Sequence, residues 1–340
     1  MASKRRYWGV IPPLPAAALG GIAKQCEEMG LEGVWGIQLW GPPFVTLAAA
    51  AMVTSRVKLG SGVALAFTRS PLETASAALD VDTISGGRMV LGIGPSVRWW
   101  NEDWYGVGYG KPIAHLREAV AVIRMIIAKG HSGELGRWEG EYYKLNLDRF
   151  KTLAPPVRTH IPIYLPALYE TAMRVAGEIA DGIATHPICS DQWVIDQVVP
   201  GVKKGLDKAG RKRSAFDLNV WFYVAPNADR QEAIRETRPT VIFYALHPQY
   251  EKYFAANGFG KQAHAIGEAA KAKDAAAMDR ACTDEMVEKF AIIGSPDEVR
   301  RRIDRIAEVA DSFTLCTPYV QLAPERMGFY GEQIAKTFYM

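Results

Sequence analysis

The sequence predicts one domain, residues 1–340, that folds as a (β/α)8 barrel with helical insertions. Short apolar segments alternate eight times with longer segments of helical periodicity. The short segments are apolar throughout, which is typical of parallel strands buried on both faces. A barrel of this type needs about 250 residues, so 340 residues leave room for two additional stretches, at 131–160 and 229–290.

The ends of several elements in the first half are marked by proline and glycine. Pro12 and Pro13 stop the first strand, and Gly30 ends the first helix. Ser70–Glu73 has the pattern of a capping box that opens the third helix, and Gly86 can end it in a left-handed conformation. We expect strands at 7–11, 33–37, 57–65 and 89–94, and helices at 15–29, 43–54, 71–85 and 112–129.

The second half resumes the alternation after residues 131–160, where Arg137–Tyr143 has the pattern of a hairpin. Residues 229–290 are predicted to be helical and polar, with no strand between the helices. Ser295–Glu298 is a second capping-box pattern. We expect strands at 161–165, 182–185, 218–225 and 313–316, and helices at 170–180, 190–209, 296–310 and 323–338.

The composition is that of a globular protein, with 49% hydrophobic and 23% charged residues. The sequence contains no run of about 18 apolar residues and no signal-peptide pattern, so we expect a cytoplasmic protein with no membrane partner. A net charge of +3 is too small to indicate nucleic-acid binding. The four cysteines lack zinc-ligand or redox spacing, so we expect reduced side chains and no metal site.

The active site of such a barrel lies at the C-terminal ends of its strands. Motifs of several other enzyme classes, such as GxxxxGK[ST], HExxH and GxSxG, do not occur. Three segments stand out instead: 59–71, 85–96 and 176–182. The small residues Gly60–Gly62 in mid-strand indicate a bulge or the close approach of a flat ligand. Taken singly, the other two segments are equally explained by glycine caps and buried strands.

Together, Ser85–Arg88, Leu91–Gly94 and Ala176–Gly182 resemble, in this order and spacing, the luciferase-like monooxygenase superfamily. The resemblance covers nearly the whole chain and includes Glu102–Gly106 and Gly294–Val299. The sequence is similar above all to the branch of oxidoreductases that depend on the deazaflavin coenzyme F420, which includes methylenetetrahydromethanopterin reductase. The resemblance implies a bacterial-luciferase-like barrel, and it separates F420 from FMN only weakly.

The resemblance further implies a noncovalently bound cofactor with its ring across the barrel. In this superfamily the third strand often bulges through a non-proline cis peptide, and the matching bond is Gly62–Val63. The turn after the fourth strand lies beside the ring, and the N-terminus of the fifth helix holds the phosphate. The expected cofactor-binding residues are Gly62, Val63, Ala64, Gly94, Pro95, Ser96, Ala167, Leu168, Tyr169 and Thr185.

Three residues are candidates for catalysis. Related reductases have an acid or a histidine after the second strand, where Gln38–Trp40 here do not titrate near neutral pH. A family acid after the fourth strand is replaced by Val97–Arg98, and Glu102 is the nearest carboxylate. His186 follows the sixth strand and is a candidate proton donor or ligand of phosphate or substrate. The expected catalytic residues are therefore Gln38, Glu102 and His186.

Charged residues also lie near the predicted site. Glu170 would repel a phosphate at the start of the fifth helix unless its side chain points away, whereas Tyr169 and Thr171 offer hydroxyl donors. Arg69 and Arg98 follow the third and fourth strands, where they meet either an anionic group or solvent.

Aromatic residues gather at predicted strand ends, which fits a pocket for a hydrophobic or planar substrate. The expected pocket residues are Trp8, Trp40, Phe67, Trp99 and Trp100. A packed lid or a dimer interface explains the same pattern equally well.

The resemblance implies an oxidoreductase that transfers a hydride between coenzyme F420 and a hydrophobic or planar organic substrate. The first alternative is an FMN-dependent monooxygenase that uses reduced flavin and oxygen. The second is a flavin-binding protein without catalysis, which the missing acid after the second strand favours. A barrel enzyme unrelated to flavins is the remaining reading. By the same resemblance we expect a homodimer.

Overall fold

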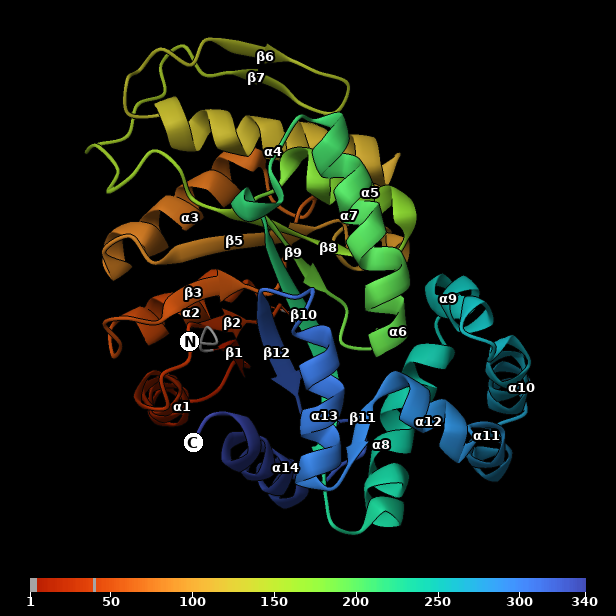
Figure 1. Cartoon of the computed structure of the whole chain (residues 1–340). Coiled ribbons are helices and arrows are strands. Elements are labelled where there is room, and N and C mark those ends of the chain that lie inside the picture. The colour runs from red at the N-terminus through yellow and green to blue at the C-terminus, as the bar shows by residue number, and fades with distance from the viewer. Residues whose placement is uncertain (1–4, 39–40) are drawn as a thin grey trace.

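The computed structural model describes residues 5–38 and 41–340, and it contains the closed parallel barrel that the sequence predicts (Figure 1). Every neighbouring pair of barrel strands is parallel, and β12 closes the barrel against β1, with Phe313 opposite Tyr7. In order around the barrel the strands are β1 (Arg6–Ile11), β2 (Gly33–Gly36), β3 (Lys58–Ser61), β5 (Met89–Gly94), β8 (Ile163–Ala167), β9 (Gly182–Thr185), β10 (Asp217–Pro226) and β12 (Ser312–Cys316).

Helices cover the outside of the barrel. The predicted capping box of Ser295 and Glu298 is present, whereas Ser70 accepts the Glu73 N–H as one half of a box. Gly86 ends its helix with a φ of 67°. The helices are α1 (Ala16–Glu28), α2 (Pro43–Ala51), α3 (Pro71–Ser85), α4 (Pro112–Lys129), α5 (Glu170–Ile179), α7 (Val199–Lys208), α13 (Pro296–Ile306) and α14 (Pro324–Phe338). Across the described ranges, no helix combines the length and the hydropathy needed to cross a lipid bilayer.

Two predicted elements are interrupted. The strand expected at 57–65 consists of β3 and a short β4 (Ala64–Leu65), with a bulge between them. The helix expected at 190–209 is divided into α6 (Asp191–Trp193), a π-helical turn η2 (Val194–Val198) and α7. Pro200 follows this turn and has no N–H to donate, so the regular hydrogen-bond pattern cannot continue through it.

The stretch at 131–160 contains the predicted hairpin, formed by β6 (Arg137–Glu139) and β7 (Lys144–Asn146). It lies over α4 (Figure 1). The Glu118 carboxylate of α4 accepts hydrogen bonds from the Trp138 indole N–H and from the Tyr142 and Tyr143 backbone N–H groups. One half-buried carboxylate therefore holds the hairpin to α4.

The stretch at 229–290 is helical, as predicted, but it is not polar throughout. It contains α8 (Arg230–Ala245), η4 (Pro248–Tyr250), α9 (Glu251–Ala256), α10 (Gly260–Lys271), α11 (Ala275–Ala281) and α12 (Asp284–Phe290). Tyr253, Phe254 and Phe290 are fully buried in a cluster that continues onto Tyr223 of β10. Directly after it, β11 (Ile292–Gly294) pairs with the end of β10, a strand that the sequence analysis did not predict.

Tryptophans fill the inside of the barrel. Trp8 and Trp35 stack with their ring centroids 4.3 Å apart. A Cβ atom on Gly33 would lie 2.4 Å from Trp8, and one on Gly60 would lie 2.3 Å from Trp35. The strand glycines therefore make room for indole rings, so Gly60 serves the core rather than a ligand.

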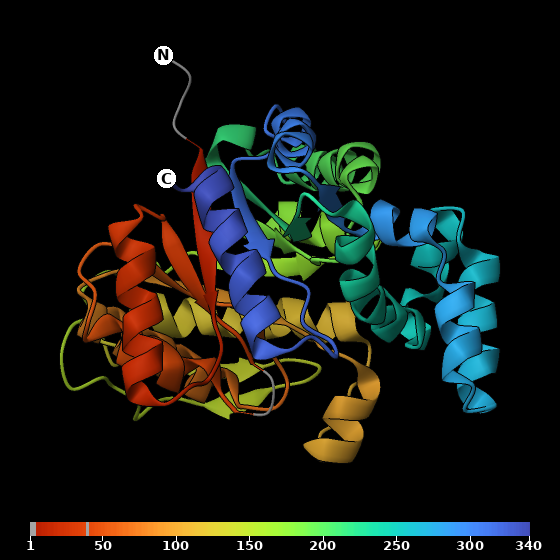
Figure 2. The same cartoon turned by 90° about the horizontal axis from the view of Figure 1, so that it is seen from below.

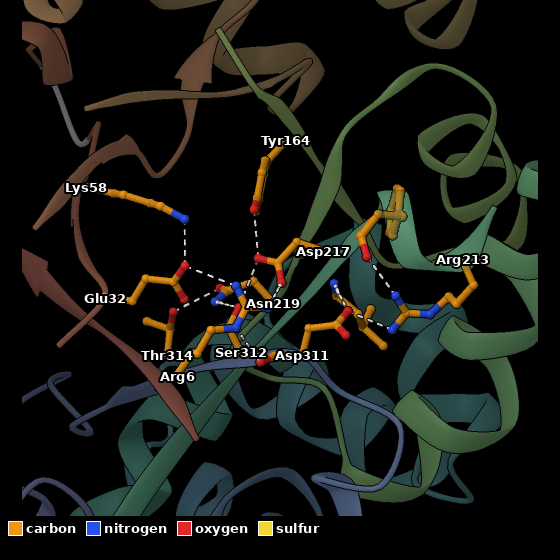
Figure 3. A network of polar contacts seen from close by, with 12 residues as sticks. Arg6, Glu32, Lys58, Tyr164, Arg213, Asp217, Asn219, Asp311, Ser312 and Thr314 are labelled. Carbon is orange, nitrogen blue, oxygen red and sulfur yellow. Dashed lines mark hydrogen bonds and ion pairs between the residues drawn. The ribbon is translucent and has the colours of Figure 1, made fainter. Parts of the chain in front are cut away.

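The base of the barrel, which we define as the end where the strands begin, holds a charged network (Figure 3). Asp217 accepts hydrogen bonds from Arg6 at 2.5 Å, the Tyr164 hydroxyl at 2.7 Å and the Ser312 hydroxyl at 3.0 Å. Glu32 binds both Arg6 and Lys58. A hydrogen-bonded chain through Ser312, Asn219 and Thr314 continues into the interior as far as the Trp35 indole, which donates to Thr314.

Candidate active site at the barrel mouth

The mouth of the barrel, which we define as the segments following β2, β4, β5, β8, β9 and β10, gathers the candidate residues from separate parts of the chain. Figure 2 shows the π-helical segment η1 (Trp100–Trp104) projecting from this end, opposite the start of β1. The segment is part of the loop between β5 and α4. Because the mouth is built from six loops, its chemistry depends on residues that the barrel brings together.

The bulge between β3 and β4 contains the cis Gly62–Val63 bond that the family resemblance implies. Both residues are partly exposed, whereas Ala64 is fully buried and pairs with Ile93 of β5. A Cβ atom on Gly94 would lie 2.4 Å from the Pro166 side chain. Glycine at that position therefore allows the mouth end of β5 to lie close to β8.

The turn after β5 is held by two side chains. Ser96 has a φ of 57°, which is uncommon for a residue other than glycine. The Tyr109 hydroxyl donates to the Ser96 carbonyl, and the buried Asn101 amide donates to the carbonyls of Pro95 and Val97. The predicted cofactor residues Pro95 and Ser96 are thus fixed by Asn101 and Tyr109, which the sequence analysis did not select.

The start of α5 lies at the mouth because this helix follows β8. Tyr169 is its N-cap and makes no side-chain capping hydrogen bond, and its hydroxyl instead donates to the Gln249 carbonyl. The Glu170 carboxylate lies 2.6 Å from the ammonium group of Lys204 on α7. The Glu170 carboxylate is therefore ion-paired with α7.

The other residues predicted for this part of the site are less accessible. Ala167 is buried, and the Leu168 carbonyl accepts a hydrogen bond from the Trp193 indole. The Thr185 hydroxyl oxygen accepts the backbone N–H of Trp221 at 2.9 Å, so Thr185 links β9 to β10.

Gln38 is a structural link between three loops of the mouth. Its amide oxygen accepts the Leu65 backbone N–H and an Arg69 guanidinium N–H, each at 3.0 Å. Its amide nitrogen donates to the Tyr105 hydroxyl at 3.3 Å. This side chain positions its neighbours and has no proton to exchange.

Glu102 lies in η1, and its carboxylate forms an ion pair with Arg98 at 2.6 Å. The Arg98 guanidinium also lies over the Tyr109 ring. Glu102 is 39% exposed, so it faces solvent on the outer part of the mouth.

His186 lies deeper, after β9. Its Nδ1 accepts the backbone N–H of Ile188, and its Nε2 lies 2.9 Å from the hydroxyl of Tyr250 in η4. Burial without an acidic partner lowers the pKa of His186 to about 3. The neutral ring therefore carries its hydrogen on Nε2 and donates it to Tyr250.

Tyr250 comes from the helical stretch and was missed by the sequence analysis. It lies 64 residues from His186, and nothing local in the sequence indicates the contact. Burial raises the pKa of Tyr250, so its hydroxyl stays protonated.

The predicted aromatic pocket is divided by the fold. Trp8 is fully buried in the barrel interior, and Phe67 is 6% exposed and stacks on His115 at 3.8 Å. Neither presents a face to a ligand in this arrangement. Trp99 is 38% exposed and packs with Trp100 and Trp104 in one cluster, while Trp40 lies outside the described residues.

Two further observations limit the site. Within residues 5–38 and 41–340, no three histidine, cysteine or acidic side chains converge as metal ligands would. A surface hollow lined by Arg5, Tyr7 and Arg300 lies at the base, where the strands begin, and takes no part in the mouth.

The sequence is similar to a known protein family and to individual proteins. A family model described as luciferase-like monooxygenase matches residues 5–312. An uncharacterised protein of Mycobacterium tuberculosis is 32% identical over 303 residues, which is 88% of each chain. The 5,10-methylenetetrahydromethanopterin reductase of Archaeoglobus fulgidus is 30% identical over 310 residues, again 88% of each chain.

Solved structures share the fold. The coenzyme F420 dependent tetrahydromethanopterin reductase of Methanopyrus kandleri has a TM-score of 0.80 at 24% identity, covering 99% of this chain and 100% of its own. The oxygenating constituent of 3,6-diketocamphane monooxygenase from Pseudomonas putida, in complex with FMN, has a TM-score of 0.69 at 18% identity, covering 99% and 98%. The family match confirms the resemblance found in the sequence: this chain belongs to the luciferase-like monooxygenase family.

Proposed function

We propose that this protein is an oxidoreductase that transfers a hydride between coenzyme F420 and a small organic substrate. A relative supports the choice of coenzyme, because a putative coenzyme F420-dependent oxidoreductase of Mycobacterium tuberculosis matches 87% of this chain at 30% identity. A bound deazaflavin would supply the carbon that accepts or gives the hydride. The protein would supply binding, orientation and exclusion of water.

The observation that carries the proposal is the start of α5. The first N–H groups of a helix point along its axis toward the N-terminal end, which here faces the mouth. The N-cap Tyr169 uses its hydroxyl elsewhere, and Glu170 is paired with Lys204. This helix end therefore suits the phosphate group of the coenzyme.

His186 and Tyr250 are the proposed proton-handling pair of this site. The imidazole is neutral over the whole physiological range and donates through Nε2 to the Tyr250 oxygen. The Tyr250 hydroxyl hydrogen is then free to be donated to a neighbouring group. Gln38 and Glu102, which the sequence analysis proposed as catalytic, have the weaker claim because Gln38 does not titrate and Glu102 is paired with Arg98.

The alternative is an FMN-dependent monooxygenase. FMN carries a phosphate that the start of α5 would bind in the same way, and a neighbour of the same fold is in complex with FMN. Titration of the purified protein with F420 and with FMN, followed by tryptophan fluorescence, separates the two. Trp99 and Trp100 at the mouth are the reporters. Tight F420 and weak FMN binding supports the reductase, and the reverse supports the monooxygenase.

A matched pair of variants tests the phosphate site. Thr171 is exposed in the first turn of α5, so Thr171→Asp places a carboxylate beside the proposed phosphate without burying it. The control is Thr283→Asp, since Thr283 is the N-cap of α12 and aspartate caps equally well. We expect at least tenfold weaker coenzyme binding for the first variant only. Equal binding by both would remove α5 from the proposal, and a folded wild-type protein that binds neither coenzyme would overturn it.

A further inference from the structure

Arg69 carries a positive charge that the described part of the protein leaves without a counter-charge. Its guanidinium donates one hydrogen bond, to the Gln38 amide oxygen, and lies 5.5 Å from the centre of the Phe44 ring. Its Nε is buried and has no hydrogen-bond partner among the described residues. No carboxylate of the described ranges lies within 4.0 Å, and residues 1–4 and 39–40 contain no aspartate or glutamate.

Arg88, which also lacks a carboxylate partner among the described residues, lies before β5 at the base and is fully satisfied. Arg88 donates all five of its N–H groups, to the carbonyls of Ser85, Val57, Ala51 and Thr54 and to the Thr54 hydroxyl. Such a guanidinium is a structural clamp that needs no further partner. Among the described residues Arg69 uses a single donor on an uncharged acceptor, so most of its binding capacity is left for another group.

The surroundings of Arg69 make its charge unfavourable as it stands. Burial lowers the pKa of Arg69, and Glu73, one turn into α3, acts on it only from a distance without an ion pair. Ser70, the N-cap of α3, follows directly, so the guanidinium also lies beside the positive end of a helix. A protein keeps a desolvated cation of this kind at a functional site when a ligand supplies the anion.

The position of Arg69 separates it from the proposed phosphate site. Arg69 follows β4 and is linked through Gln38 to the segment after β2, whereas α5 follows β8, with β5 between them. A planar cofactor spanning the mouth with its phosphate at α5 would therefore leave Arg69 to the substrate. The Phe44 and Tyr105 rings beside it suit an apolar or aromatic body.

We propose that Arg69 binds an anionic group of the ligand, a carboxylate or a phosphate, and that the substrate of this enzyme is an organic anion. The identification of the bound anion as the substrate rests on the proposed function. The anion-binding site itself stands on the geometry. The same chemistry is present in the acidic tail of coenzyme F420, which FMN lacks, so the experiment includes an arm for that source.

The test uses small probes and the intact chain. Benzoate, its neutral analogue benzamide and inorganic phosphate are titrated calorimetrically into wild type, Arg69→Gln and Arg69→Lys. Lys111→Gln, which removes a charge from an exposed ion pair with Glu141, is the control for net charge. We expect wild type and the control to bind at least one anion ten times more tightly than benzamide. Arg69→Gln loses that preference, and Arg69→Lys keeps part of it.

A structural role for Arg69 predicts a different result. If Arg69 only held Gln38 in place, Arg69→Gln would lower the urea midpoint, whereas removal of an uncompensated charge leaves the midpoint unchanged or raises it. Loss of the anion preference with unchanged F420 affinity assigns the site to the substrate. Weaker F420 and unchanged FMN binding assigns it to the coenzyme tail. Wild type without an anion preference, or Arg69→Gln with the wild-type preference, overturns the proposal. Wild-type F420 binding in the same series tests the proposed function separately.

Discussion

At the base of the barrel, Asp217 accepts hydrogen bonds from Arg6, Tyr164 and Ser312, whereas at the mouth Arg69 donates to a single amide oxygen. Both ends contain buried or half-buried charges from several strands. At the base each charge has a partner of opposite sign (Figure 3). At the mouth the described partners of Arg69 and His186 are uncharged.

This difference follows from what each end has to do. Complementary charges at the base stabilise the closed sheet, and they leave nothing for a ligand to bind. Polar groups at the mouth that lack full partners cost stability, and under the proposed function they provide the binding energy for a ligand. The comparison predicts that substitutions at the base change stability and that substitutions at the mouth change binding and pH dependence.

The largest expected effect is at the base. Asp217→Ala leaves the Tyr164 hydroxyl without its acceptor and removes an ion pair from Arg6. We expect the free energy of unfolding, measured in urea, to fall by about 3 kcal/mol. Coenzyme affinity of the folded fraction should not change. A loss below about 1 kcal/mol would mean that the network behaves as an exposed ion pair, and the contrast between the two ends would fail.

The next effect is a pH dependence at the mouth. The folded-state pKa of His186 is about 3, below its usual value, so the unfolded chain binds a proton between about pH 3 and 6.5 that the folded chain does not. Stability is therefore lost as the pH falls through this range, by at most about 1.4 kcal/mol per pH unit for one proton. His186→Gln should have a shallower slope between about pH 4.5 and 6.5. Burial also lowers the pKa values of His115 and His247, so both of these contribute to the slope in either protein. The difference in slope between wild type and His186→Gln therefore isolates His186. Equal slopes would show that His186 is hydrated.

The smallest effect concerns the exposed pair near the start of α5. Lys204→Gln frees the Glu170 carboxylate, whose pKa the hydrogen bond from Lys204 lowers, close to the proposed phosphate. Affinity for F420 should weaken roughly two- to fivefold, with stability unchanged, because both side chains are exposed. Glu170→Gln should act in the opposite direction and tighten binding. Changes of the same sign in both variants would show that the start of α5 does not contact the phosphate.

Much of the fold could be predicted because it is encoded locally. Periodicity, glycines and prolines placed the barrel strands and a hairpin at 137–143, whose second strand the structure places at Lys144–Asn146. β11 escaped prediction because three apolar residues after a helix have no pattern of their own until β10 lies beside them. The buried aromatic cluster of the helical stretch, with Tyr253 and Phe290, was likewise missed because its members come from separate helices.

The position of the candidate site in the barrel could be predicted, but the contacts of its residues could not. The order of strands puts Gln38, Arg69 and His186 at one end of any such barrel. Their roles depend on contacts across long separations, such as that of Gln38 with Arg69 and that of His186 with Tyr250. Trp8 shows the opposite failure, because its position in the chain does not reveal that its ring points into the barrel interior.

The sequence by itself determined the barrel and its family, and it predicted the end where chemistry is expected, because these depend on periodicity and on short motifs that act locally. Tertiary structure decided which charges are compensated. Asp217 begins β10 and Arg69 follows β4, and neither local sequence reveals its partners. Among the described residues, only the packing of distant segments gives Asp217 three donors and Arg69 a lone amide oxygen. Charge compensation is a property of the space around a side chain, and that space is assembled only when the barrel closes.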